Sequence, residues 1–200
     1  CRSASPTASR QGDHWDIPEA EQREVLRAYF ASITFMDAQV GRLLDTIDRL
    51  GLRDNTVIVF VSDHGYHLGD HGGLWMKPGV FERTTRAPLI IAGPGVTARG
   101  GESVRVVEFL DLYPTLADLA GLTAPREVEG RSMQALLRNP HAPWEYPALS
   151  QMLKNGPSTP AAPPRPVTGA AEDSGMAHVP PGAVMGYSLP TEHWLYIDWE

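Results

Sequence analysis

The sequence predicts an α/β fold in which a mainly parallel central sheet is flanked by helices. A long segment that ends near Leu50 has apolar residues at three- and four-residue steps, which is the period of a helix that covers a sheet. The run Val57–Val61 is apolar and β-branched, as is typical of a strand buried on both faces. Pro88–Ala92 is a second expected strand, and Asp111–Ala120, with Asp111 as its N-cap, a second helix. This alternation argues for stacked layers of helices and strands.

The composition is that of a globular domain with a core. The chain has 200 residues, of which 42% are hydrophobic and 20% charged, and its formal net charge is −7. A nucleic-acid-binding domain needs a basic face, so the acidic balance argues against a nucleic-acid partner. No apolar stretch approaches the roughly 18 residues that a membrane span needs. The one cysteine, Cys1, excludes an internal disulfide framework.

The first part of the chain is expected to be a loop followed by a long helix. Residues 1–13 have no apolar periodicity. Asp16 with Glu19 resembles a capping box, Pro18 suits the first turn, and Gly51 is expected to stop the helix. An unbroken helix of this length would extend over roughly 50 Å, so a bend or a split is expected.

The segment after Val57–Val61 carries the residues suited to chemistry. Asp63 and His64 follow the expected strand end, where ligands bind in open α/β sheets, and Gly65 lets the backbone come close. An Asp and a His in this place are candidate ligands for a cation. Lys77 follows 12 residues after Gly65, beyond a glycine-rich loop. Together these features indicate a site for a tetrahedral oxyanion.

Seven strings of the sequence form a joint pattern: SDHG, LGDHG, LWMK, FER, APLIIAGPG, DLYPTLADLAGL and EGRSM. The pattern resembles the sulfatases of the alkaline phosphatase superfamily, and within them the iduronate-2-sulfatase and choline-sulfatase-like branch. It extends over about Trp15 to Gln151, with a weaker echo in MGYSLPTEHWLYIDW. The resemblance implies an alkaline-phosphatase-like sandwich and the start of a small C-terminal antiparallel sheet.

The resemblance also implies an activity, the hydrolysis of a sulfuric ester of a carbohydrate or a small alcohol. Relatives use one Ca²⁺ and a formylglycine nucleophile, which a formylglycine-generating enzyme makes from Cys or Ser. By this resemblance, Asp63 and His64 would be metal ligands, Lys77 would bind the sulfate, and His71 would act near the substrate. Two alternatives stay open: His71 could make only loop hydrogen bonds, and Asp63 with His64 could be a capped strand end with a surface histidine.

The chain departs from the family pattern at the nucleophile. Neither string of Cys1–Arg10 has the spacing of the C/S-x-P-S-R motif, and the two upstream Asp ligands are also missing. We therefore expect the C-terminal portion of a longer enzyme, inactive in isolation. A phosphonate or phosphate monoester hydrolase of the same superfamily and a truncated, non-catalytic relic are the rival interpretations.

Three regions are expected along the chain. Residues 1–150 would be the C-terminal part of the catalytic domain, 151–183 a flexible insertion rich in Pro and Gly, and 184–200 the first strand of the C-terminal subdomain. Pro190 stands where relatives often have Arg, and a proline in a strand favours an edge position. The sequence does not name the compartment, although the resemblance is compatible with a periplasmic, extracellular or lysosomal protein.

Overall fold

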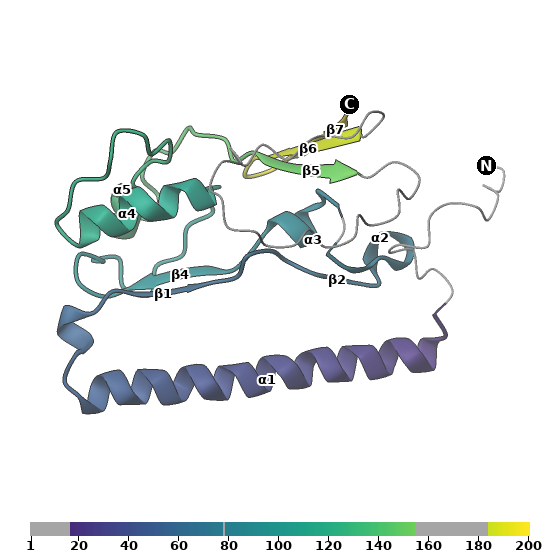
Figure 1. Ribbon diagram of the computed structural model, residues 1–200, viewed down its shortest axis with the longest axis horizontal. Coiled ribbons are helices and arrows are strands. Elements are labelled where there is room, and N and C mark those ends of the chain that lie inside the picture. Colours follow the sequence, from purple (N-terminus) through teal and green to yellow (C-terminus); the bar gives the residue numbers. More distant parts are fainter. Residues whose placement is uncertain (1–16, 78, 155–183) are drawn as a thin grey trace, which may run out of the picture.

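The computed structural model describes residues 17–77, 79–154 and 184–200. The elements in chain order are α1 (Glu19–Arg49), η1 (Arg53–Asn55), β1 (Ile58–Val61), β2 (His67–Leu68), α2 (Asp70–Gly73), β3 (Trp75–Met76), α3 (Glu82–Thr85), β4 (Leu89–Ala92), η2 (Phe109–Asp111), α4 (Leu112–Leu119), α5 (Gln134–Arg138), β5 (Ser150–Lys154), β6 (Val184–Pro190) and β7 (Leu195–Trp199). In Figure 1, α1 lies on one side of the β1–β4 pair, and α4, α5 and the C-terminal strands lie on the other. No helix in the described part of the chain is long and apolar enough to span a membrane.

The α/β class and the small C-terminal antiparallel sheet are confirmed, but the strand pairing differs from the expected parallel one. β1 pairs with β4 in antiparallel register, from Ile58 opposite Ala92 to Val61 opposite Leu89. The other strand pairs among the described residues are antiparallel too. Burial on both faces is not found either, because Val61 is 40% exposed and Ile90 61%. An apolar run identifies a strand, whereas its neighbours depend on distant parts of the chain.

The first helix, α1, is one continuous helix of 31 residues, so the expected bend or split is wrong. Pro18 is its N-cap residue, and the expected capping partner Asp16 lies outside the described residues. None of the helix residues is buried, and Phe30 and Leu43 are 58% and 63% exposed. A helix of this length covers about 46 Å, whereas a strand of four residues spans about 13 Å, so the β1–β4 pair covers only part of its apolar stripe.

The segment before α4 is held by a buried carboxylate. Asp111 is 3% exposed. Its oxygens accept hydrogen bonds from the backbone N–H of Glu108 at 2.9 Å and of Arg131 at 2.7 Å. The carboxylate therefore caps the short helix η2 and ties it to the segment before α5, and the expected N-cap bond to α4 is not formed. Thr115, also buried, accepts a bond from the N–H of Met133 at 2.8 Å and so joins α4 to the start of α5.

The C-terminal sheet has the order β5-β6-β7. The expected edge position of Pro190 is wrong, because β6 is the middle strand. The proline is tolerated at the last residue of β6, since the ladder with β5 stops at Ser188 opposite Ser150 and Pro190 pairs with Leu195 alone. Strand β5 begins at the expected domain boundary and includes the first residues of the expected insertion, whose residues 155–183 lie outside the described ranges.

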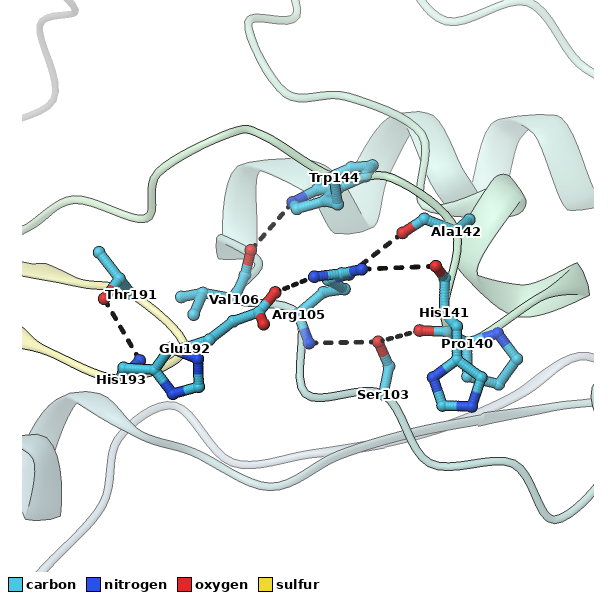
Figure 2. A network of polar contacts seen from close by, with 10 residues as sticks. All are labelled: Ser103, Arg105, Val106, Pro140, His141, Ala142, Trp144, Thr191, Glu192 and His193. Carbon is cyan, nitrogen blue, oxygen red and sulfur yellow. Dashed lines mark hydrogen bonds and ion pairs between the residues drawn. The ribbon is translucent and has the colours of Figure 1, made fainter.

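A polar network joins the C-terminal hairpin to the rest of the molecule (Figure 2). Arg105 forms an ion pair with Glu192, in the turn between β6 and β7. The same guanidinium donates hydrogen bonds to the carbonyl oxygens of Ala142 at 3.1 Å and His141 at 3.4 Å. Trp144 adds a bond from its indole N–H to the carbonyl oxygen of Val106 at 2.9 Å. The loop around Arg105 thus holds two segments that are distant in sequence.

Candidate functional site

The site begins at the C-terminal end of β1, where the backbone makes a close approach to α3. The N–H of Gly65 donates a hydrogen bond to the carbonyl oxygen of Thr84 at 2.8 Å. A Cβ atom on Gly65 would lie 2.0 Å from the carbonyl oxygen of Arg83, so no other residue fits without a shift of the backbone. The predicted close approach at this glycine is confirmed, and it positions the preceding residues against α3.

Asp63 and His64 direct two metal-ligating atoms into the same space. The Nδ1–H of His64 donates to the carbonyl oxygen of Gly65 at 2.7 Å, because a carbonyl can only accept. In the neutral ring, Nε2 then keeps its lone pair, and it lies 3.6 Å from Oδ1 of Asp63. The Asp63 side chain is 83% exposed. In metal sites, the ring nitrogen of a histidine that does not bind the metal commonly donates to a backbone carbonyl in this way, which sets the tautomer.

These two donors fit part of a cation site. A carboxylate oxygen is a good Ca²⁺ ligand, whereas imidazole is commoner on softer metals. Across residues 17–77, 79–154 and 184–200 there is no group of three or more His, Cys, Asp or Glu side chains that could hold a metal ion. Since Ca²⁺ takes about six to eight oxygen ligands, the pair needs further ligands from elsewhere.

Lys77 shares a cleft of about 340 Å³ with Asp63 and His64. The antiparallel pairing of β2 with β3 returns the chain toward the strand end, so residues far apart along the loop meet. Lys77 is exposed, and among the described residues its ammonium has no ion-pair partner. One wall of the cleft therefore combines a carboxylate, an imidazole and an unpaired cation, which suits an anionic group bound together with a metal ion.

The structure does not place His71 among the residues that line this cleft. Its ring stacks on Phe81, with 4.2 Å between the ring centroids, and its Nε2 lies 3.6 Å from a carboxylate oxygen of Asp70. Its φ of 49° is in the left-handed region, which is uncommon for a residue with a side chain. The packing contacts agree with the loop alternative, and an acid or base function for His71 stays a prediction.

His67 and Asp70 fix the hairpin that leads to Lys77. His67 is fully buried, and its Nδ1 lies 2.7 Å from Oδ2 of Asp70. Burial raises the pKa of the Asp70 carboxyl. Hydrogen bonds from His67 and from the N–H groups of Leu68 and Asp70 lower it by more than burial raises it, so this pKa lies below its usual range. Nε2 of His67 is buried and has no hydrogen-bond partner in the described structure. The ionised carboxylate thus holds the start of the loop in place.

Another part of the cleft lining comes from residues that sequence reasoning missed: Phe109, Ser150, Gln151 and Met152. Strand β5 reaches the site through a bond from the N–H of Gly79 to the sulfur of Met152 at 3.0 Å, between residues 73 positions apart. Apolar and polar residues come in pairs around Ser150, in the string ALSQMLK, so the alternation that is typical of a half-buried strand is not present. Nothing in the local sequence indicates that the first residues of β5 line the same cleft as Lys77.

The α/β fold and a cleft lined by an aspartate, a histidine and a lysine agree with an enzyme that binds an anionic group. The Sulfatase family model matches residues 3–122. The choline-sulfatase of Rhizobium meliloti (strain 1021) is 46% identical over 110 residues, which cover 55% of this chain and 21% of that relative. The iduronate 2-sulfatase of Homo sapiens is 33% identical over 216 residues, which cover 92% and 39%. The chain belongs to the sulfatase family.

Solved structures share the fold over most of this chain. A protein in complex with its substrate D-glucosamine-2-N,6-O-disulfate matches with a TM-score of 0.67 and 26% identity over 90% of this chain and 34% of the other. A phosphonate monoester hydrolase of Agrobacterium radiobacter matches with a TM-score of 0.69 and 22% identity over 92% and 34%, which shows a common fold alone. The chain spans 39% or less of the length of these relatives and structures.

Proposed function

We propose that this chain supplies the sulfate-binding part of the active site of a sulfuric ester hydrolase. The supporting observation is that Asp63, His64 and Lys77 line one cleft, although they come from two different segments. Family membership supports sulfate-ester chemistry, and two of the relatives act on choline sulfate and on iduronate 2-sulfate by their names. The substrate would be a sulfated carbohydrate or a small sulfated alcohol.

Each of the three side chains has a role in this proposal. Asp63 and His64 would be two of the ligands of one Ca²⁺, together with ligands from outside the described residues. A bound Ca²⁺ would neutralise charge on the sulfate oxygens. Lys77 donates hydrogen bonds to those oxygens and stabilises the negative charge that increases on them in the transition state. His71 remains the proposed group that would exchange a proton with the alcohol.

The nucleophile of the proposed reaction is a formylglycine that these 200 residues do not supply, because the sequence contains no C/S-x-P-S-R motif. A formylglycine-generating enzyme is therefore a required partner of the protein that carries this chain. The chain by itself is expected to bind sulfate weakly and to turn over no ester.

The test is an assay of the protein that carries this chain, co-expressed with a formylglycine-generating enzyme and supplied with Ca²⁺. We expect hydrolysis of 4-nitrophenyl sulfate in preference to 4-nitrophenyl phosphate. Lys77→Ala is expected to lower kcat by about 10²–10³, because it removes one preorganised donor. Arg99→Ala, which removes an exposed positive charge that does not line this cleft, is the matched control and should leave kcat unchanged.

Preferred turnover of the phosphate, or of a phosphonate monoester, would overturn the proposal in favour of the rival branch of the superfamily. An absence of turnover with every ester, although the upstream residue is modified and Ca²⁺ is present, would support the non-catalytic relic.

A further inference from the structure

The cleft of Asp63, His64 and Lys77 has a second wall with no charged side chain. We call it the β5 wall and define it by Phe109, Ser150, Gln151 and Met152. The Phe109 ring is 50% exposed, and Gln151 is exposed as well. The two walls face a common space of about 340 Å³, within the size range of sites for small molecules.

The β5 wall is fixed at both of its ends. The backbone N–H of Leu149 donates to a carboxylate oxygen of Glu108 at 2.7 Å, and Glu108 immediately precedes Phe109. At the other end, the N–H of Gly79, which lies two residues after Lys77, donates to the sulfur of Met152 at 3.0 Å. These bonds set the distance between the aromatic ring, the strand and the lysine loop before any ligand binds, and such preorganisation lowers the entropic cost of binding.

The β5 wall also offers hydrogen-bonding groups that have no other use in the described structure. No hydrogen bond to another side chain is formed there by the Gln151 amide or the Ser150 hydroxyl, within the described residues. Among the strands that the structure describes, β5 pairs with β6 alone, so the polar backbone groups of its other edge add to this set. An amide supplies both donors and an acceptor, as a partner with several hydroxyl groups requires.

We propose that the β5 wall is the subsite for the alcohol half of the ester, and that it takes a neutral, hydroxyl-rich ring, namely a sugar. This inference rests on the proposed function, in which Lys77 holds the sulfate group. The exposed face of Phe109 packs against the apolar face of a sugar ring, while the Gln151 amide forms hydrogen bonds with the hydroxyl groups of that ring. Gln151 is thereby the specificity-determining residue.

A quaternary ammonium alcohol fits this cleft less well. Such cations are recognised by several aromatic faces or by carboxylates. Among the described lining residues, Phe109 is the one aromatic ring and Asp63 the one carboxylate, and Asp63 is assigned to the metal ion. The chain is therefore expected to prefer a sugar sulfate to choline sulfate, even though a choline-sulfatase is a relative at 46% identity.

The experiment compares kcat/KM for glucosamine 6-sulfate, choline sulfate and 4-nitrophenyl sulfate, with the protein that carries this chain. Gln151→Ala is expected to lower kcat/KM for the sugar sulfate about tenfold, mainly through KM, and to change the value for the aryl sulfate less than about twofold, because an aryl group makes no hydrogen bond to the amide. Gln39→Ala is the matched control, since Gln39 is exposed on α1 and, within the described ranges, its side chain bonds only to Arg42, at 2.8 Å. It should change none of the three values.

A second measurement works without turnover. In saturation-transfer NMR, the ring protons of glucosamine 6-sulfate should receive saturation from the wild-type protein and markedly less from the Gln151→Ala variant. If the wild-type protein did not hydrolyse the aryl sulfate, the proposed function would be wrong, and the NMR comparison would then decide the sugar subsite by itself. Equal effects of Gln151→Ala on all three esters, or an about tenfold preference for choline sulfate over the sugar sulfate, would overturn the subsite.

Discussion

Gly65 is the residue on which the geometry of the candidate site depends most directly. Its missing side chain allows the strand end to contact the carbonyl oxygen of Arg83, which a Cβ atom would approach to 2.0 Å. Gly65→Ala is expected to destabilise the fold by about 1–3 kcal/mol, the usual cost of overpacking. The backbone shift that the added Cβ atom requires would also move Asp63 and His64 relative to Lys77. Chemical denaturation measures the loss of stability.

Gly41 provides a control for Gly65, because it lies in α1 and a Cβ atom there meets nothing within 4 Å. Gly41→Ala is expected to raise stability by about 0.5–1 kcal/mol, because alanine has less conformational entropy than glycine in the unfolded chain and therefore loses less of it when the helix forms. If the two variants had equal stability, the close approach at Gly65 would not be tight in solution.

At the residue scale, sequence reasoning recovered the side chains whose type suggests chemistry. Asp63, His64 and Lys77 were predicted as a group, and they do line one cleft. Phe109 and Gln151 were missed, since a phenylalanine or a glutamine has no distinguishing type and their place follows from contacts across more than one segment. Asp111 was expected to cap α4, but its carboxylate caps η2 instead and also accepts a bond from the N–H of Arg131.

The hairpin of β2 and β3 is the element that presents Lys77, and its stability is expected to depend on pH through Asp70. The pKa of this carboxyl is lowered in the folded state. A group with a lowered pKa stabilises the fold at pH values above its unfolded pKa, near pH 4, and loses this contribution as pH falls through the folded value. The hairpin should therefore be most secure at neutral pH and weaken below about pH 4.

Asp70→Asn tests this expectation, because asparagine keeps one acceptor oxygen but not the charge. We expect a loss of about 1–2 kcal/mol at pH 7, and a smaller loss as the pH falls through the lowered pKa of the folded state, where the wild-type carboxyl becomes protonated as well. Asp37→Asn, at an exposed position of α1, is the control. The measurement is the free energy of unfolding at several pH values, and a difference between wild type and Asp70→Asn that did not shrink on acidification would contradict the role of the charge.

At the scale of elements, the sequence predicted type better than arrangement. The apolar run of β1 and the helical period of α1 depend on local pattern, and both elements are present. The pairing of β1 with β4 and the continuity of α1 depend on what packs against them, which a local pattern does not contain. The proline of β6 shows the same limit, because its tolerance depends on where the ladder of β5 stops.

At the scale of the whole molecule, the C-terminal sheet is attached through the network of Arg105 as well as through β5. This attachment matters for the site, because β5 forms one wall of the cleft. The side chains of Arg105 and Glu192 are only 26% and 30% exposed, so their ion pair is less screened than a surface pair. Figure 2 shows the guanidinium between Glu192 and the carbonyl groups of His141 and Ala142.

Arg105→Ala is expected to loosen β6 and β7 without unfolding the β1–β4 pair. The variant leaves Glu192 and two carbonyl groups without their donor, and hydrogen bonds to charged groups contribute about 1.5–3 kcal/mol each before solvent screening reduces them. Native-state hydrogen exchange should show faster exchange in residues 184–199 and little change in β1. Arg23→Ala removes the pair with Glu19, whose side chains are 68% and 78% exposed, and should leave both regions unchanged. Uniform acceleration throughout the chain in Arg105→Ala would contradict this expectation, because it would mean that the C-terminal sheet and the region of the candidate site open as one unit.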